Sequence, residues 1–247
     1  MRNIRPAMAY AAGACHNFGM CFSATASLTA AFGLGAMGAV TLREARTWDR
    51  IPLAAMPLLF GLQQAVEGVV WLSFGLPWLH SAAAFVYVMF SHVLWPFYVP
   101  LAVGALESPG RRKTALRIFL LMGIALSLWL LTYVLRGPVT ASCDTGSVVY
   151  QMTLPPIPYG LAVYVLVTCC SCLISSHKFI RVLGLALVGA LAISLWAYLA
   201  AFYSVWCFFS ALLSAIIYVH LRHGERLSAL VGKYGQAARA RLGRGRK

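Results

Sequence analysis

The sequence predicts an all-α fold, a polytopic membrane bundle of seven transmembrane helices with the N-terminus outside and the C-terminus in the cytoplasm. Three observations predict it. Of the 247 residues, 61% are hydrophobic and 11% are charged, and the mean hydropathy is +0.78. A soluble domain is usually nearer half apolar and a quarter charged. Seven apolar runs follow one another along the chain, and basic residues gather in alternate connections between them.

Each apolar run is close to the twenty or so residues that a helix needs to cross a bilayer. Short connections join them, so seven crossings use nearly the whole chain. The sixth and seventh runs are close enough to form a tight helical hairpin. The runs cover residues 22–42, 51–75, 81–105, 114–135, 156–175, 179–199 and 202–221.

The distribution of charge predicts the orientation. The chain has a net charge of +14, and seventeen of its twenty Lys and Arg residues lie in the connections 43–50, 111–117 and 178–181 and in the segment from Arg222 onward. The opposite side has only Arg2, Arg5 and Arg136. Cytoplasmic loops carry an excess of Lys and Arg, so the N-terminus is predicted to lie outside and the C-terminus in the cytoplasm.

Two terminal segments flank a membrane domain that we place at residues 20–222. Residues 1–19 resemble nothing structural, and Met20 makes a natural start, so this segment is expected to be disordered or not native coding sequence. No apolar run precedes Cys15, which excludes a lipoprotein signal. Residues 223–247 form a basic, Gly-rich tail. Contact with anionic lipid headgroups explains its charge, and we expect no nucleic acid partner.

Small residues and prolines give individual spans their character. Gly33, Gly35 and Gly38 in the first span let neighbouring backbones approach closely. Pro96 and Pro100 predict a kink toward the cytoplasmic half of the third span. The fourth span is apolar throughout and is expected to face lipid. The sixth is small and aliphatic, which favours close packing.

Glu67 in the second span is the only acidic residue inside any of the seven runs. A carboxylate at depth in a bilayer costs roughly 2.5 to 3.5 kcal/mol, so such residues usually face a partner or a cavity. Gln63 and Trp71 lie four residues to either side of Glu67 and Gln64 lies three before it, which places all of them on one face of a helix. By helix rise Glu67 lies roughly 12 Å below the outer end of its span, about one turn above His92.

Two interpretations of Glu67 and His92 stay open. In the first, they form a site that handles protons or polarises a substrate, because an ionisable group at this depth is a functional hypothesis by default. In the second, they form a buried hydrogen-bonded knot that fixes helix packing, with Gln63 and Gln64 satisfying a neutral acid. The sequence does not show whether His92 faces Glu67.

Seven cysteines are divided between the two sides of the membrane. Cys21, Cys143 and Cys207 lie on or near the outer side, where disulfides form, and a Cys21–Cys143 bridge would tie the long outer loop to the first helix. The three cysteines at 169, 170 and 172 lie near the cytoplasmic face and are expected to be packing residues. We expect no metal, since no Cys-x-x-Cys or His-x-x-x-His spacing is present, and no cofactor. A retinal Schiff base is excluded because the seventh span has no lysine.

Several short motifs resemble those of an uncharacterised family of seven-helix bacterial membrane proteins. They are Met20-Cys-Phe-Ser-Ala24, Pro57-Leu-Leu-Phe-Gly-Leu-Gln-Gln-Ala-Val-Glu-Gly68, Trp95-Pro96, Ser175-Ser-His-Lys178 and Val205-Trp-Cys-Phe-Phe209. The resemblance covers about residues 20–221. It implies a fold and an orientation but no reaction.

The chain has a weaker likeness to small membrane-bound terpene cyclases, which are also seven-helix proteins with a functional acid on the second span. Glu67 fits that position, but the second acid expected on the last span is absent. This likeness is therefore an analogy of fold.

We therefore expect a multi-pass protein of the bacterial inner membrane with a buried polar site that opens outward. The leading function is binding of a small molecule or lipid, as a sensor or permease component. The alternative is an intramembrane enzyme acting on a lipid or isoprenoid, with Glu67 as acid and His92 as its partner. A structural partner protein comes third. The ligand-binding residues that we predict are Ser23, Gln63, Gln64, Trp71 and Trp206.

Overall fold

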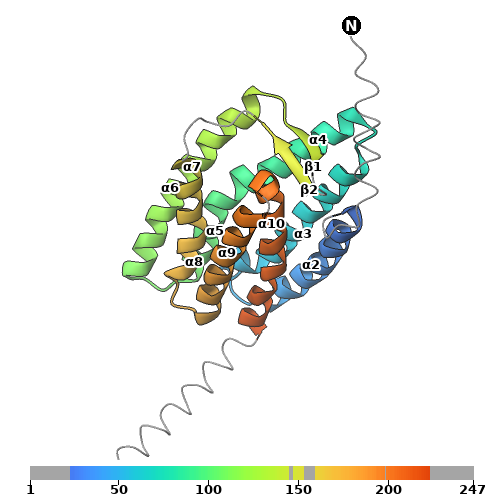
Figure 1. Cartoon of the computed structure of the whole chain (residues 1–247). Coiled ribbons are helices and arrows are strands. Elements are labelled where there is room, and N and C mark those ends of the chain that lie inside the picture. The colour runs from blue at the N-terminus through green and yellow to red at the C-terminus, as the bar shows by residue number, and fades with distance from the viewer. Residues whose placement is uncertain (1–22, 145–146, 153–158, 198, 223–247) are drawn as a thin grey trace, which may run out of the picture.

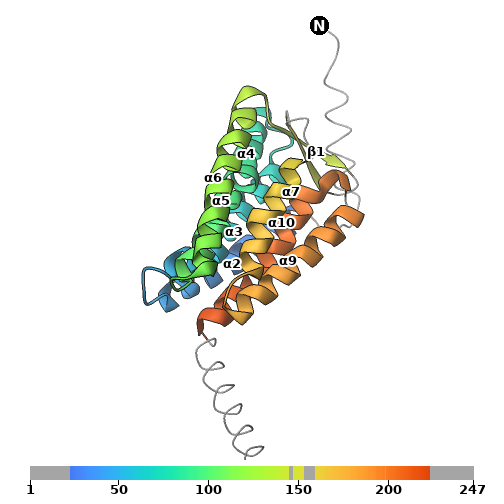
Figure 2. The ribbon, with the colours of Figure 1, turned by 90° about the vertical axis from the view of Figure 1, so that its left-hand side faces the viewer.

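The computed structural model describes residues 23–144, 147–152, 159–197 and 199–222, and they form a helical bundle with one small sheet (Figure 1). The helices run side by side, with α4, α5 and α6 toward one side and α9 and α10 toward the other (Figure 2). In chain order the elements are α2 (Ala24–Glu44), α3 (Ile51–Leu72), α4 (Pro77–Val88), η1 (Met89–Leu94), α5 (Trp95–Leu106), α6 (Arg111–Arg136), β1 (Thr140–Asp144), β2 (Ser147–Gln151), α7 (Tyr159–Val165), η2 (Leu166–Cys170), α8 (Ser171–Leu173), α9 (Lys178–Ala197), η3 (Leu199–Ala201) and α10 (Phe202–Leu213).

Six helices in the described part of the chain are long and apolar enough to cross a membrane, which confirms a multi-pass membrane protein. They agree with six of the predicted spans to within four residues at either end. The predicted fifth span corresponds to the shorter apolar helix Gly160–Leu173. Residues 153–158, where that span was predicted to start, lie outside the described residues. A seventh crossing therefore stays a prediction.

The fold is mostly helical, as predicted, and it also contains a two-stranded antiparallel hairpin that the sequence analysis did not predict. β1 and β2 pair from Thr140 opposite Gln151 to Asp144 opposite Ser147. Val148 is fully buried against Val70 and Ala83. The β-branched and aromatic residues of the connection between α6 and α7 favour strands once they can pack on the bundle. The hairpin lies across the end of the bundle where α3 ends and α4 begins (Figure 1).

His80 on α4 holds this hairpin in place. Its Nε2 lies 2.9 Å from the carbonyl oxygen of Ala141 on β1. Its Nδ1 lies 3.2 Å from the Ser73 hydroxyl and 3.2 Å from the Val70 carbonyl oxygen, both at the end of α3. One imidazole therefore joins α3, α4 and the hairpin.

Glycines allow close approach at fewer positions than predicted. A Cβ at Gly38 would lie 2.5 Å from the Leu58 amide nitrogen, so this glycine is required where α2 packs on α3. A Cβ at Gly33 or Gly35 would meet nothing within 4 Å. Packing at the glycine's own Cβ position therefore explains Gly38 but not Gly33 or Gly35. At Gly35 the close approach depends on α3 instead, because a Cβ at Gly61 would lie 2.9 Å from the Gly35 amide nitrogen.

The third span contains an irregular turn immediately before its first proline. Residues Met89–Leu94 form a π-helical segment that links α4 to α5. Pro96 has no N–H to donate to the preceding turn, and π-helical turns commonly accommodate such defects. The Tyr164 hydroxyl donates instead to the Ser91 carbonyl oxygen, at 2.6 Å. The predicted kink site is thus stabilised by a neighbouring helix.

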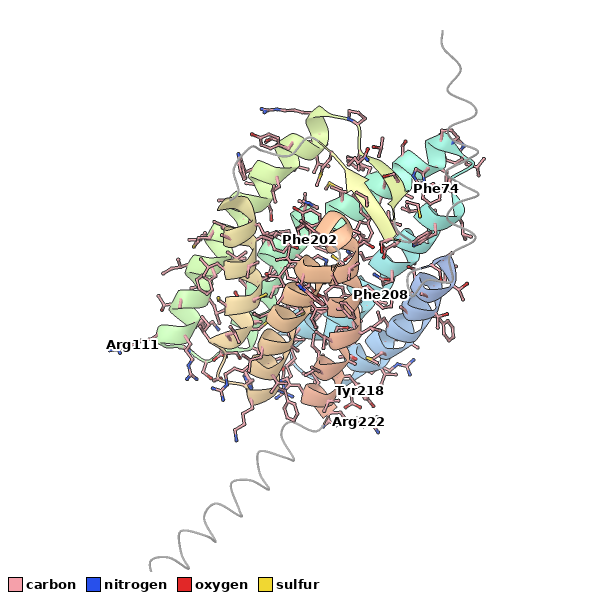
Figure 3. The ribbon with its side chains drawn as sticks, viewed as in Figure 1. Phe74, Arg111, Phe202, Phe208, Tyr218 and Arg222 are labelled. Carbon is pink, nitrogen blue, oxygen red and sulfur yellow. The ribbon has the colours of Figure 1, made fainter. Side chains whose placement is uncertain are left out.

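Basic side chains collect at one end of the bundle. Of the eleven Lys and Arg residues in the described part of the chain, ten lie at the ends that carry the α2–α3, α5–α6 and α8–α9 connections or at Arg222, where the last candidate span ends. Figure 3 shows Arg111 and Arg222 at this end and Phe74 at the other. Arg136 is the one described exception, at the hairpin end. This separation is the pattern that the positive-inside rule requires.

A buried carboxylate ties the connections together at the basic end. Glu107 follows α5 and is only 4% exposed. It accepts hydrogen bonds from the Ser175 hydroxyl at 2.7 Å and the Ser176 amide at 2.6 Å. Burial raises the pKa of Glu107, but these hydrogen bonds outweigh burial and leave the pKa below its ordinary value. The Glu107 carbonyl also accepts from Lys113 at 3.0 Å.

Candidate functional site

Glu67 points into the bundle interior. Its side chain lies on the buried face of α3 and is 2% exposed. The Ser204 hydroxyl on α10 donates a short hydrogen bond to Glu67 Oε1. Ser204 is itself 2% exposed. The bundle therefore encloses this carboxyl completely and brings the last span to it.

Two tyrosines and an amide lie around the carboxyl. Tyr150 from β2 and Gln64 from α3 lie beside Glu67 but without the geometry of a hydrogen bond. Tyr150 stacks on Tyr87 of α4 with parallel rings and centroids 4.2 Å apart. The hairpin therefore covers Glu67, and the predicted outward opening is closed in this structure by Tyr150 and the strand that carries it.

Gln63 links the carboxyl region to an aromatic group below it. Its side chain is fully buried, and its Oε1 accepts a hydrogen bond from the Trp95 indole at 2.7 Å. Indole N–H is only a donor, so this bond fixes the orientation of the Gln63 amide. Trp95 in turn stacks on Phe60, with ring centroids 4.0 Å apart.

His92 lies in the interior but does not bond Glu67. It lies in the π-helical turn, is 2% exposed, and its Nδ1 is 2.8 Å from the Ser91 hydroxyl. Its ring packs on Tyr203 of α10, with centroids 4.5 Å apart. The structure has no direct hydrogen bond between His92 and Glu67. His92 instead contacts α10 through the ring of Tyr203.

Many polar atoms at this centre have no hydrogen-bond partner. We call the residues that carry or surround them the polar cluster. The unpartnered buried atoms are Gln63 Nε2, Gln64 Nε2 and Oε1, the hydroxyls of Tyr87 and Tyr150, and His92 Nε2. The cluster is these five residues together with Glu67 and Ser204. More than nine in ten buried polar groups in proteins are paired, so this concentration of unpaired groups is unusual.

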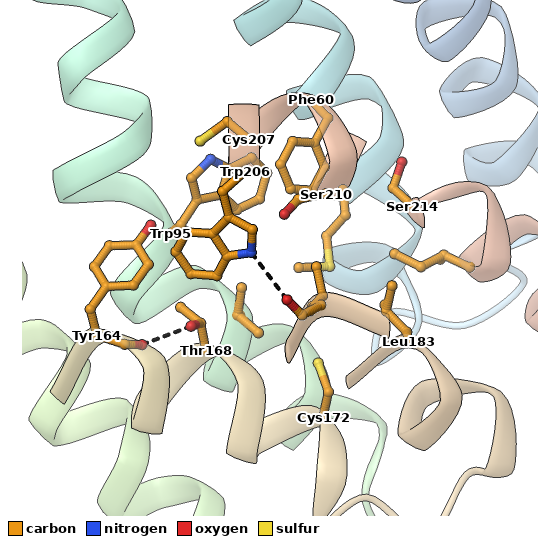
Figure 4. A pocket seen from close by; sticks show the side chains of 14 residues that line it. Phe60, Trp95, Tyr164, Thr168, Cys172, Leu183, Trp206, Cys207, Ser210 and Ser214 are labelled. Atoms are coloured by element: carbon orange, nitrogen blue, oxygen red, sulfur yellow. Dashed lines mark hydrogen bonds between the residues drawn. The ribbon is translucent and has the colours of Figure 1, made fainter. Parts of the chain in front are cut away.

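A narrow apolar cavity adjoins the polar cluster, and we call it the aromatic slot (Figure 4). Its volume is about 40 Å³. Trp95 and Cys207 line it, and each also contacts the cluster: Trp95 through its bond to Gln63, and Cys207 by lying beside Gln63 and Tyr87. The full lining is Met56, Phe60, Trp95, Val99, Tyr164, Thr168, Cys172, Leu183, Leu187, Trp206, Cys207, Ser210, Ser214 and Ile217.

Trp206 lines the aromatic slot, and its predicted ligand-binding role stays a prediction. Its indole donates to the Leu187 carbonyl oxygen at 3.2 Å, and its ring meets Tyr164 edge to face at 5.5 Å between centroids. Figure 4 shows both rings over the same cavity. Trp206 therefore contacts both α9 and α7.

Two other predicted residues lie away from the cluster. Trp71 packs against the hairpin and against Ala201 and Val205, so it supports the hairpin that covers Glu67. Ser23 is the N-cap of α2, where its hydroxyl accepts from the Ala26 amide at 3.2 Å. It lines a separate open groove of about 650 Å³ between α2 and α10. Helix spacing alone could not show this separation.

The cysteines divide as follows. Cys143 is disulfide-bonded, and its predicted partner Cys21 lies outside the described residues. Cys207 is a free thiol, 6% exposed, so its candidacy for a disulfide is corrected: it points into the slot beneath the hairpin. Cys169 and Cys172 are also free and buried, in the apolar core.

Sequence reasoning missed four contributors to this site. Tyr150 was hidden in the outer connection, although Asp144-Thr-Gly-Ser147 followed by Val-Val-Tyr150 has the form of a tight hairpin turn and a strand. Ser204, Tyr87 and Tyr203 carry no local signal, because serine and tyrosine are common in membrane helices and only packing shows which way they face.

The fold and the site together define a polytopic helical membrane protein with a polar cluster enclosed in its core. The chain belongs to DUF6629, a family of unknown function whose model matches residues 20–230. Membership of an uncharacterised family, predicted from the motifs, is thereby confirmed. No curated protein and no solved structure matched in the corresponding comparisons.

Proposed function

We propose that this protein binds a small molecule or lipid at the polar cluster and acts as a sensor or permease component of the bacterial inner membrane. The observation that carries the proposal is the set of unpartnered polar atoms around Glu67. A buried donor or acceptor without a partner costs about 1–3 kcal/mol. A protein keeps such a group when a ligand or water completes it, and functional sites are the usual place for this.

The proposal includes seven crossings, with the hairpin outside. The helix Gly160–Leu173 packs in the bundle core through Val167, Cys169 and Cys172, alongside α5 and α9. If this helix is the seventh crossing, all ten basic side chains of the basic end lie on one side of the membrane, the cytoplasmic side. The hairpin and the polar cluster then lie toward the outer face.

Binding is favoured over permeation by the lining of the aromatic slot. A permease needs a polar path that reaches both faces. Below Gln63 the slot offers the hydroxyls of Thr168, Ser210 and Ser214 among apolar and aromatic side chains. Two of these already donate to backbone carbonyls of their own helices, at 2.7 Å for Thr168 and 2.6 Å for Ser214. A polar solute would therefore lose its hydration there without replacement.

The second candidate function is an intramembrane enzyme that acts on a lipid or isoprenoid. The observation that favours it is the carboxyl of Glu67 held above an apolar, aromatic-lined cavity. Glu67 would donate its proton to a carbon of a double bond, whose π electrons form the new C–H bond. Loss of a proton from the resulting cation to the carboxylate would restore the acid. Tyr150 lies beside Glu67, and His92 packs on Tyr203. In this reaction both side chains would serve as proton relays to Glu67.

A comparison of molecules bound to purified variants tests the proposal. The full chain is purified from membranes and its bound small molecules are extracted and identified by mass spectrometry. We expect the wild-type protein to retain a compound near one per chain that Gln64→Leu and Glu67→Gln lose. The exposed variant Leu185→Phe, on the lipid-facing side of α9, serves as the control and should retain it. Identical profiles in all four proteins would contradict ligand binding at this cluster.

A further inference from the structure

We infer that the ligand is a neutral, single-chain amphiphile whose head is an alcohol-type oxygen and whose apolar chain occupies the aromatic slot. This inference rests on the proposed function and names the class of molecule that the same site takes. Three features of the structure support it: the hydrogen-bonding character of the unpaired atoms, the absence of a matching charge in the cluster, and the closure of the outer end.

The unpaired atoms require a head group that both accepts and donates. Gln63 Nε2 and Gln64 Nε2 are donors and need an acceptor oxygen. Gln64 Oε1 is an acceptor and needs a donor. An ammonium head has no acceptor and would leave both amide nitrogens unpaired. A hydroxyl has one donor and two acceptor lone pairs, so it can satisfy Gln63 and Gln64 together.

Charge excludes an anionic head. The polar cluster contains no Lys or Arg, and in the described part of the chain those residues lie at the ends of the bundle. A carboxylate or phosphate placed here would face Glu67 with no counter-charge, which costs several kcal/mol in a low-dielectric interior. The head is therefore uncharged.

The slot sets the form of the rest of the ligand. Along the last candidate span, Phe202–Arg222, it extends from Cys207 to Ile217, a distance of roughly 15 Å by helix rise. Its volume of about 40 Å³ holds a few water molecules and is too small for an alkyl chain as it stands. Binding of the chain therefore requires Trp95 and Trp206 to turn aside, and the long, thin space that this opens accepts an unbranched chain more readily than a fused ring system.

The closed outer end indicates that such a ligand comes from the bilayer. Tyr150 stacks on Tyr87 above Glu67, Val148 is fully buried, and His80 fastens β1 to α3 and α4. Water-soluble ligands would have to displace this hairpin. A chain-bearing alcohol dissolved in the membrane needs only the apolar slot.

Photolabelling with a long-chain alcohol tests the inference. The full chain in lipid nanodiscs is irradiated with lauryl alcohol that carries a diazirine at the far end of its chain, and the adducts are mapped by peptide mass spectrometry. With the head at the cluster, the far end should label the lower slot, near Met56, Cys172 and Ile217. Unlabelled lauryl alcohol should compete, whereas n-dodecane, which has no head, and laurate, which is anionic, should not.

Variants distinguish the two levels of the proposal. Ser210→Phe fills the slot and should lower labelling roughly tenfold, a loss of about 1.4 kcal/mol in binding, whereas Leu185→Phe should leave it unchanged. Because Ser210→Phe can disturb folding, Leu187→Ala provides the opposite test: it widens the slot and should raise labelling. If labelling ignores Gln64→Leu, the cluster is no binding site and the proposed function falls. If it needs Gln64 but the adducts lie on the hairpin, or if laurate competes, the amphiphile inference falls alone.

Discussion

Gln63 and Gln64 are adjacent, chemically identical and both fully buried, yet replacement by leucine should change stability in opposite directions. Leucine is close in volume to glutamine but has no polar atoms. Gln64 has neither amide atom paired, whereas the Gln63 oxygen accepts from Trp95 at 2.7 Å. The pair therefore tests whether the polar cluster contains real unpaired groups.

The magnitudes follow from the partners. Each buried polar atom without a partner costs about 1–3 kcal/mol. Gln64→Leu removes two such atoms and gives up a weak attraction to Glu67, so we expect a gain of about 1–3 kcal/mol. Gln63→Leu removes one unpaired atom but leaves the Trp95 indole N–H without an acceptor, so we expect a loss of about 1 kcal/mol. For a chain of this size 1 kcal/mol corresponds to roughly 2–4 °C in Tm.

The chain supplies its own reporter for the measurement. Cys169, Cys172 and Cys207 are buried free thiols that become reactive when the bundle opens. A thiol-reactive dye that fluoresces on coupling, followed during heating of the detergent-solubilised protein, gives Tm for each variant. A lower Tm for Gln64→Leu than for the wild type would refute the reasoning, because it would mean that both amide atoms already have partners, such as ordered water.

Three further predictions concern packing, pH and the carboxyl contact. Gly123→Ala on α6 should lower Tm markedly, because its Cβ would lie 2.1 Å from the Pro96 carbonyl oxygen, whereas Gly189→Ala, which meets nothing within 4 Å, should be neutral or slightly stabilising by the same thermal assay. Folding lowers the pKa of Glu107, so its carboxylate stabilises the fold at pH values above 4.5, the ordinary pKa of the group. This stabilisation is lost as the pH falls through the pKa of the folded protein. The Tm measured from pH 7 to pH 3 should therefore fall more steeply in the wild type than in Glu107→Gln. Ser204→Ala and Glu67→Gln should be non-additive by about 1 kcal/mol in a double-mutant cycle, since each removes part of one hydrogen bond; strict additivity would argue against that contact.

The spans and the burial of Glu67 could be predicted from sequence because both follow from transfer energetics. Apolar runs of about twenty residues leave few alternatives to a crossing helix, and a carboxyl within one must turn inward. Spacing also placed Gln63 and Gln64 on the same buried face. These inferences need only one helix at a time.

The partners of Glu67 could not be predicted because they depend on how helices rotate about one another. Ser204 lies 137 residues away in sequence, and nothing local distinguishes it from other serines. The π-helical turns add an offset that periodicity does not register: the turn before Trp95 changes which way His92 and Ser91 face. Tyr150 required recognition of a strand pair within a membrane protein, where helical periodicity dominates the pattern.

The contact between Glu67 and Ser204 also constrains biogenesis. Glu67 enters the membrane early, on the second helix, while Ser204 and the strand that carries Tyr150 are synthesised much later. Until the final helix inserts and the hairpin packs on the bundle, the acid has to be sheltered by lipid, water or the insertion machinery. A chain that ends before residue 204 therefore lacks the hydroxyl that donates to this carboxyl, and the acid stays without that partner at the centre of the incomplete bundle.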